Sequence, residues 1–213
     1  MFMGPPGSGK GTQANAAQER WGFERIETGA LLRKMRDDPS ADSQRVKALM
    51  DAGHLAPPPL VADLVIRETR SILGSGKGIV FDGSPRTLYE AERLRAALME
   101  DHINRVLVVV LDVPKPETIH RILRRWVCTG CTRPAPKADT VPGVCAACGG
   151  TFARRADDTA EVMKKRWEEY AFRTLPVIQY FERQGLAVRV DGHRSIPEVT
   201  EDVQRRIEER LQR

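Results

Sequence analysis

The chain has 213 residues, of which 41% are hydrophobic and 30% are charged, and its formal net charge at pH 7 is +5. This is an ordinary globular composition, enough for one domain with a small insertion. Acidic and basic residues are interleaved without a tail of like charge, so we expect phosphate-bearing small molecules, and no nucleic acid, as ligands. No segment approaches the roughly 18 apolar residues of a membrane-spanning helix and no signal peptide is evident, so we expect a cytoplasmic protein without a membrane partner.

In chain order, short apolar runs alternate with longer segments of helical periodicity. The runs with the length of buried strands are 78–82, 106–112 and 187–191. The segments with helical periodicity are 10–20, 30–36, 43–52, 60–73, 88–99, 116–126, 159–184 and 196–211. This alternation predicts an α/β fold with a doubly wound parallel sheet.

Two segments depart from this pattern. Only three residues precede Gly4, whereas a strand before a phosphate loop normally has about five. This predicts either a truncated first strand or a chain that begins downstream of its natural start. Segment 127–154 holds all four cysteines, four glycines and three prolines without sustained periodicity, so we interpret it as an insertion outside the sheet.

Residues 4–12 read Gly-Pro-Pro-Gly-Ser-Gly-Lys-Gly-Thr, which misses the strict phosphate-loop pattern by one position because Gly11 precedes Thr12. The glycines allow backbone N–H groups to converge on an anion at the positive end of the following helix. Lys10 adds a charge for β- and γ-phosphates, and Thr12 offers a hydroxyl to a phosphate oxygen or a metal-bound water. A turn rich in Gly and Pro is the alternative, but it does not explain the lysine. The predicted phosphate cradle is Gly7, Ser8, Gly9, Lys10, Gly11 and Thr12.

The four cysteines form two C-x₂-C pairs, Cys128 with Cys131 and Cys145 with Cys148, separated by thirteen residues. In a reducing compartment this spacing favours a tetrahedral structural Zn²⁺ site over disulfides, with every ligand position filled and none left for catalysis. Four free thiols are the alternative. A zinc ribbon can also bind nucleic acid, and the residues that would then contact its phosphates are Arg124, Arg125, Arg133 and Lys137. The nearby aromatic residues are Trp126 and Phe152, which we expect to pack within the lid and not to stack on bases.

Several further motifs occur in a fixed order between Gly4 and about Val199. They are Gly-Lys-Gly-Thr at 9–12, Thr-Gly at 28–29 before Leu-Leu-Arg at 31–33, Met-Asp-Ala-Gly at 50–53, Asp-Gly-Ser-Pro-Arg-Thr at 82–87, Arg121 with Arg125, Arg-Ala-Asp-Asp at 155–158, Arg166, and Val-Asp-Gly at 190–192. This ordered set resembles the adenylate kinases and related nucleoside monophosphate kinases. The resemblance implies a P-loop core of 1–27, 74–126 and 159–213, a helical nucleotide-binding arm of 28–73 and a zinc lid of 127–158.

The resemblance also implies the chemistry: transfer of a phosphoryl group from ATP, with Mg²⁺, to a nucleoside monophosphate, most directly AMP, by a monomer whose lid closes. Such transfer demands positioning and charge neutralisation, for which guanidinium groups are well suited. The implied catalytic residues are Lys10, Asp82, Arg86, Arg125, Arg155 and Arg166. The implied ATP site adds Arg121, Arg125 and Arg194 to the phosphate cradle. The implied acceptor site is Thr28, Arg33, His54, Leu55, Ala56, Gly83, Arg86, Glu90, Arg155 and Arg166.

Asp82 ends an apolar strand and is the candidate for holding Mg²⁺ through water, with a turn-forming aspartate as the alternative. Three positions depart from the family pattern: Ala30 replaces an aspartate, Ser84 replaces a phenylalanine, and Glu90 replaces a glutamine that reads adenine. Because an ionised Glu only accepts hydrogen bonds, it would suit the two adjacent donors of guanine. Three alternatives remain: a kinase for GMP or another nucleotide, a Glu90 that points to solvent, and a slow nucleotide-binding paralogue.

Overall fold

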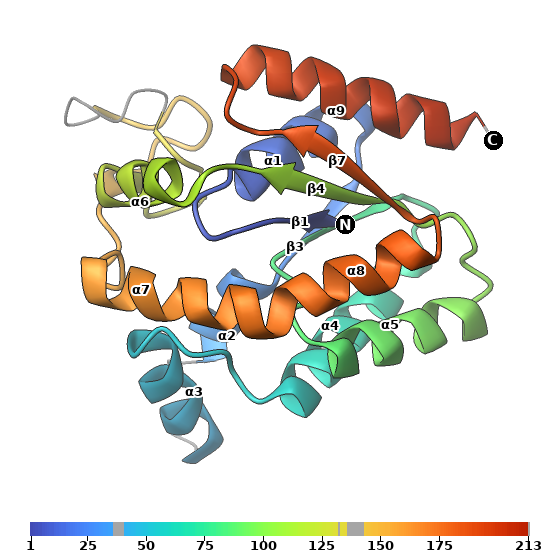
Figure 1. The fold of residues 1–213 in the computed structure, drawn as a ribbon, viewed down its shortest axis with the longest axis horizontal. Helices are drawn as coiled ribbons and strands as arrows, with labels where there is room; N and C mark the ends of the chain where they lie inside the picture. The colour runs from blue at the N-terminus through green and yellow to red at the C-terminus, as the bar shows by residue number, and fades with distance from the viewer. Residues whose placement is uncertain (36–40, 132, 136–142, 213) are drawn as a thin grey trace.

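The computed structural model describes residues 1–35, 41–131, 133–135 and 143–212, and a five-stranded parallel sheet forms its centre (Figure 1). The strand order is β2-β3-β1-β4-β7. The strands are β1 (Phe2–Met3), β2 (Glu24–Glu27), β3 (Ile79–Asp82), β4 (Val108–Asp112) and β7 (Ala187–Asp191). Strands β2 and β3 lie on one side of β1, and β4 and β7 lie on the other. The predicted doubly wound sheet is therefore confirmed.

Helices cover both faces of this sheet. On one face lie α1 (Lys10–Trp21) and α9 (Ile196–Leu211), which contact each other and the strands beneath them (Figure 1). The remaining helices are α2 (Thr28–Met35), α3 (Ala41–Asp51), α4 (Pro58–Leu73), α5 (Leu88–Glu100), α6 (Lys115–Leu123), α7 (Ala160–Glu169) and α8 (Leu175–Arg183). Of these, α8 packs on β7 and α5, and α4 packs on β2 and α5. None of the helices in the described ranges is both long and hydrophobic enough to cross a bilayer.

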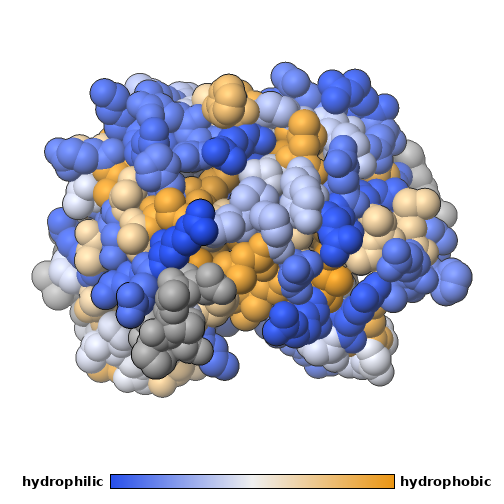
Figure 2. All heavy atoms as spheres, turned by 90° about the horizontal axis from the view of Figure 1, so that it is seen from below, coloured by the Kyte–Doolittle hydropathy of each residue, from blue (hydrophilic) through white to orange (hydrophobic). Residues whose placement is uncertain are grey.

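Strand β4 shows how the core is divided between the two faces. Val109 and Leu111 pack in the cluster that includes residues of α1 and α9, whereas Val108 and Val110 pack against α8. Successive side chains of a strand point to opposite faces, and a strand covered on both sides is therefore apolar throughout. A third cluster joins β2 and β3 to α2, α3, α4 and α5. Seen from the α3, α4 and α5 side, most of the surface is hydrophilic, with hydrophobic side chains near the middle (Figure 2).

The sequence did not predict β2, because three of its four residues are charged. It is an edge strand, and its charged side chains alternate with the buried Ile26. The first strand is indeed short, with only two residues, yet β1 pairs with both β3 and β4 at the centre of the sheet.

The predicted helix of 159–184 is interrupted. A π-helical turn, Tyr170–Thr174, separates α7 from α8, and Pro176 lies in the first turn of α8. Proline lacks an N–H donor and its ring clashes with the carbonyl four residues earlier, so the regular hydrogen-bond ladder cannot continue through it.

The insertion at 127–154 lies outside the main sheet, as predicted. Its described residues form a separate antiparallel pair, β5 (Val127–Cys128) with β6 (Phe152–Ala153). Helix α6 ends at Leu123, three residues earlier than predicted, because the chain turns toward β5. Parts of the predicted arm and lid, residues 36–40, 132 and 136–142, lie outside the described ranges, as do Arg213 and the predicted helix end at Arg36.

Phe181 of α8 is fully buried, whereas Phe172, nine positions earlier on the same helical run, is 81% exposed. We expect Phe181→Ala to lower the free energy of unfolding by about 3–5 kcal/mol, because the substitution loses apolar burial and leaves a cavity. Phe172→Ala, the matched control, should change it by about 0.5 kcal/mol or less. Urea denaturation of both variants measures the difference, and equal losses would contradict this packing.

Candidate active site

One cavity of about 590 Å³ lies at the carboxyl ends of β1, β2 and β3, and every residue predicted for the nucleotide sites lines it. In open parallel sheets, ligands bind at this end of the strands, beside the point where the strand order reverses. Other lining residues come from α4, from the segment after β6, and from α7 and its π-helical turn. The sheet therefore gathers side chains as far apart in the sequence as Phe2 and Val199.

The phosphate loop connects β1 to α1 and depends on three glycines with positive φ: Gly4 (139°), Gly7 (86°) and Gly9 (94°). A Cβ at Gly4 would lie 2.5 Å from the backbone oxygen of Leu111, and one at Gly7 would lie 2.5 Å from that of Thr118. Side chains are therefore excluded at both positions. No side chain caps the N-terminus of α1, so its first N–H groups can bind an anion.

The Lys10 ammonium is held inside this loop. Its Nζ donates to the backbone oxygens of Gly4 at 2.9 Å and Pro5 at 2.8 Å. Burial lowers the pKa of Lys10 to about 7, with smaller contributions in the same direction from the charges of Arg86 and Arg125 and an opposing one from Asp82. A bound polyanion would favour the charged form of this lysine.

Two arginines predicted to act on the transferring group share one carboxylate. Arg125 donates to both oxygens of Asp158, at 2.8 Å and 2.8 Å, and Arg166 donates to Asp158 at 3.3 Å and to Asp157. Arg155 lies close by, and burial together with the charges of Arg125 and Arg33 lowers its pKa to about 10. These three guanidinium groups therefore converge on one part of the cavity.

The predicted acceptor side of the cavity contains Arg33 and Arg86. Arg86 donates from Nε to the backbone oxygen of Gly83 at 2.7 Å, and burial lowers the pKa of its guanidinium group. Arg33 donates to Glu27 at 2.7 Å. His54, predicted to border the acceptor base, lines the cavity and pairs with Glu169 at 2.8 Å.

Glu90 does not point to solvent, so that interpretation of the sequence is wrong. Its relative exposure is 2%, because its carboxylate folds back onto the start of α5. Oε2 accepts from the Arg86 N–H at 2.8 Å and from the Ser84 hydroxyl at 3.3 Å, and Oε1 accepts from the Thr87 hydroxyl at 3.0 Å. Burial raises the pKa of Glu90, and these hydrogen bonds partly offset the effect.

Two residues that the sequence analysis missed also line the cavity, Arg25 and Glu27 of β2. Arg25 binds Asp82 at 2.5 Å and lies 3.2 Å from Glu27. Asp82, the predicted magnesium residue, is therefore paired with a cation. The sequence does contain a pattern that could have identified them: Arg25 and Glu27 lie two residues apart, directly before the Thr-Gly motif. Alternate residues of a strand share a face, so both side chains would point to the same side of the sheet.

At the other end of the cavity, Arg121 and Arg194 occupy the predicted ATP side. Arg121 donates to Glu117 at 2.6 Å and to the backbone oxygen of Gly192 at 3.0 Å. Arg194 donates to Asp202 at 2.8 Å. Both arginines are fixed by neighbours from α6, α9 and the loop after β7.

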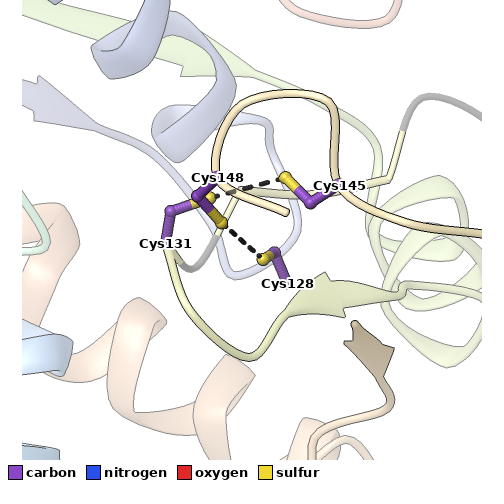
Figure 3. Close-up of side chains that lie close together, drawn as sticks. All are labelled: Cys128, Cys131, Cys145 and Cys148. Carbon is purple, nitrogen blue, oxygen red and sulfur yellow. Dashed lines mark hydrogen bonds between the residues drawn. The ribbon is translucent and has the colours of Figure 1, made fainter. Parts of the chain in front are cut away.

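The four cysteines lie together around the β5–β6 pair (Figure 3), and they are not among the residues that line the cavity. Their sulfur atoms all lie within 4.8 Å of one another, with Cys128 and Cys148 3.4 Å apart and Cys131 and Cys145 3.7 Å apart. Tetrahedral zinc with bonds of about 2.3 Å places its sulfur ligands about 3.8 Å apart, so this cluster could hold zinc. Backbone N–H groups of Cys131 and Gly130 lower the pKa of Cys128 to about 6.

Each described arginine considered for nucleic-acid contact has a partner within the chain. Arg133 pairs with Glu19 at 2.6 Å, Arg125 binds Asp158, and Arg124 lies 2.8 Å from His120. Lys137 lies outside the described residues. Trp126 is covered by the Arg154 guanidinium, 5.1 Å from the ring centroid.

Comparison with known proteins gives the same assignment as this geometry. The family model described as adenylate kinase matches residues 2–186. The chain belongs to the adenylate kinase family. Curated adenylate kinases of Carboxydothermus hydrogenoformans and Rhizobium etli are 37% and 36% identical to it, covering 93% and 96% of this chain and 94% and 96% of their own lengths. The adenylate kinase of Dehalococcoides mccartyi is 34% identical over 95% of this chain and 94% of its own length.

Membership of the adenylate kinase family makes the chain a phosphotransferase. The matched region contains every predicted site residue except Arg194, and it includes all four cysteines. The family assignment therefore rests on a match that spans the phosphate loop, most of the cavity residues and the cysteine cluster.

The lowered pKa of Lys10 predicts that ATP binding takes up a proton. At pH 8 the free protein holds Lys10 largely neutral, since its pKa is about 7, and the phosphates of ATP stabilise the charged form. Calorimetry in buffers of different ionisation enthalpy should give an uptake about one proton larger for the wild type than for Lys10→Met at pH 8. The difference should shrink at pH 6, where Lys10 is already charged. An equal uptake in both proteins at pH 8 would contradict the assignment.

Proposed function

We propose that this chain transfers the γ-phosphoryl group of ATP to AMP and forms two molecules of ADP. The observation that carries the proposal is the convergence of Lys10 and six arginines on one cavity, together with a glycine loop at a helix N-terminus. The six arginines are Arg25, Arg33, Arg86, Arg125, Arg155 and Arg166. Phosphoryl transfer between two polyanions needs alignment and charge neutralisation more than covalent participation by the protein.

The arrangement supports a division of labour between the two nucleotides. The phosphate loop and Lys10 would hold the ATP phosphates, since they form the anion cradle at the start of α1. Arg33 and Arg86 would hold the acceptor phosphate. Arg125 and Arg166, which share Asp158, would contact the transferring group between them. Arg121 and Arg194 would border the ATP base.

The Mg²⁺ that accompanies ATP would be bound with the help of Asp82. This carboxylate lies at the end of β3, and a Cβ at Gly11 of the phosphate loop would lie 3.3 Å from its Oδ2. Carboxylate oxygens are the protein ligands that Mg²⁺ prefers. When bound, the ion would neutralise charge on the phosphates. Ala30 offers no second carboxylate at the family's usual position.

The acceptor base would lie against Thr28 and Glu90. The Thr28 hydroxyl is buried, lines the cavity and has no hydrogen-bond partner in the described part of the chain. A carboxylate offers about four lone-pair positions. On Glu90, three of them accept hydrogen bonds from its own chain, two on Oε2 and one on Oε1. Guanine would need an acceptor on each oxygen. One remaining position on Oε1 fits a single donor, such as the 6-amino group of adenine, so the geometry favours AMP over GMP.

The cysteine cluster would hold a structural Zn²⁺ that makes the predicted lid one compact unit. The donor set is four sulfurs with spacings near those of a tetrahedral site, and a structural site leaves no open position for chemistry. Closure of this lid would bring Arg155 over the nucleotides and exclude water, which prevents ATP hydrolysis. Four thiolate ligands suit a reducing compartment, in keeping with a cytoplasmic protein.

A coupled assay with ATP, Mg²⁺ and each of AMP, GMP, CMP and UMP tests the function. We expect AMP to be the best acceptor, with kcat/KM at least about tenfold above that of GMP, because Glu90 lacks the free acceptors that guanine requires.

Arg86→Lys should lower kcat/KM for AMP by about 100-fold, since an ammonium cannot replace a buried guanidinium fork.

Exposed Arg93 of α5, which pairs with Asp63 outside the cavity, provides the control, and Arg93→Lys should leave the rate unchanged. Higher activity with GMP would contradict the base assignment. No turnover with any of the four acceptors would instead support a nucleotide-binding paralogue.

Metal analysis tests the zinc proposal. We expect about one zinc ion per chain, because the four cysteines form one tetrahedral donor set. Cys145→Ser should lose the metal and lower Tm by several degrees, whereas Thr151→Ser in the same segment, which retains its hydroxyl, should do neither. A metal-free wild type whose Tm does not respond to added zinc would contradict the proposal.

A further inference from the structure

Glu27, the last residue of β2, places a carboxylate among three arginines inside the nucleotide cavity. Arg33 donates to its Oε1 at 2.7 Å, and Arg155 lies 3.9 Å from the same oxygen. Arg25 lies 3.2 Å from Oε2. The Glu27 side chain is 16% exposed, so water screens these contacts only in part.

The three arginines come from different parts of the chain: Arg25 from β2, Arg33 from α2 and Arg155 from the segment after β6. Arg33 is the proposed ligand of the acceptor phosphate, and Arg155 is the proposed closing residue of the lid. A guanidinium group presents the same N–H donors to a carboxylate as to a phosphate. Glu27 therefore occupies donors that the acceptor phosphate needs.

Without a nucleotide, these guanidinium groups repel one another, and they need an anion. Burial is the main cause of the lowered pKa of Arg155; the charges of Arg125 and Arg33 lower this pKa further, and Glu27 raises it. In the described cavity, Glu27 is the carboxylate that contacts Arg33 and lies nearest to Arg155.

The register of the sheet shows what would hold Glu27 once a phosphate arrived. Glu27 of β2 pairs with Asp82 of β3, and the Nη2 atom of Arg25 lies between their carboxylates. Glu27 would keep Arg25 as its partner after releasing Arg33 and Arg155. The exchange leaves no buried charge unpaired, so it can be reversible.

We propose that Glu27 is an internal competitor of the acceptor phosphate, which neutralises Arg33 and Arg155 in the free protein and thereby weakens acceptor binding. The proposal rests on the proposed function, because it takes the acceptor to be a nucleoside monophosphate. A phosphate monoester carries more negative charge than a carboxylate and displaces it from the two arginines.

Calorimetric titration of AMP, without ATP, tests this competition in Glu27→Gln. We expect the Kd for AMP to fall about tenfold, because the amide keeps the shape of the side chain but removes the competing charge. Adenosine, which lacks the phosphate, should bind both proteins equally. Glu24→Gln is the matched control, since Glu24 lies on the same strand but pairs with exposed Lys77, and it should leave both affinities unchanged.

Weaker AMP binding by Glu27→Gln would overturn the proposal, because Glu27 would then position the arginines instead of competing for them. An equal change for AMP and adenosine would also overturn it. Should Glu27→Gln fold poorly, Glu27→Asp shortens the reach to Arg33 while keeping the charge, and it should bind AMP more tightly than the wild type. If the wild type bound no AMP, the proposed function would fail, and the same comparison with inorganic pyrophosphate would still decide whether Glu27 competes for these arginines.

Discussion

The site depends on one electrostatic constraint: many cations must lie close together before the anions that they bind arrive. Like charges in a partly buried cavity repel strongly, and burial also disfavours each charged form. The lowered pKa values of Lys10, Arg86 and Arg155 are the direct result. The structure meets the constraint with carboxylates that neutralise the arginines without filling the cavity.

These carboxylates are positioned by the sheet and by the loops at its carboxyl edge. Glu27 and Asp82 end neighbouring parallel strands in register, so the same backbone pairing that builds the sheet fixes the distance between them. Asp158 precedes α7 and serves Arg125 and Arg166 together. A fold that brings strand ends together therefore supplies both the cationic residues and their counterions. Under the proposed function, binding of substrate would exchange one set of anions for another.

The sequence predicted the parts of this arrangement that are encoded locally. The phosphate loop is recognisable because its conformation excludes side chains at Gly4 and Gly7, and the cysteine pairs because zinc geometry dictates their spacing. Edge strand β2 was missed because its charges hide the usual apolar pattern. The roles of Arg25 and Glu27 were missed with it, since neither can be assigned a partner until the register of β2 with β3 is known. Likewise, the burial of Glu90 depends on Ser84 and Thr87 lying opposite its carboxylate, and no periodicity encodes that contact.

The same electrostatic constraint would couple phosphate binding to movement of the segment that carries Arg155. Arg155 belongs to the segment that follows the cysteine cluster, yet its nearest carboxylate partner in the described cavity is Glu27 at the end of β2. The separation of 3.9 Å is long for a direct hydrogen bond, so this contact holds the segment near the cavity only weakly. A phosphate placed between Arg33 and Arg155 would attract both more strongly than one carboxylate does. Charge exchange at Glu27 and closure over the nucleotides would then be a single event, driven by the added charge of the phosphate, and a free protein without that charge would stay easier to open.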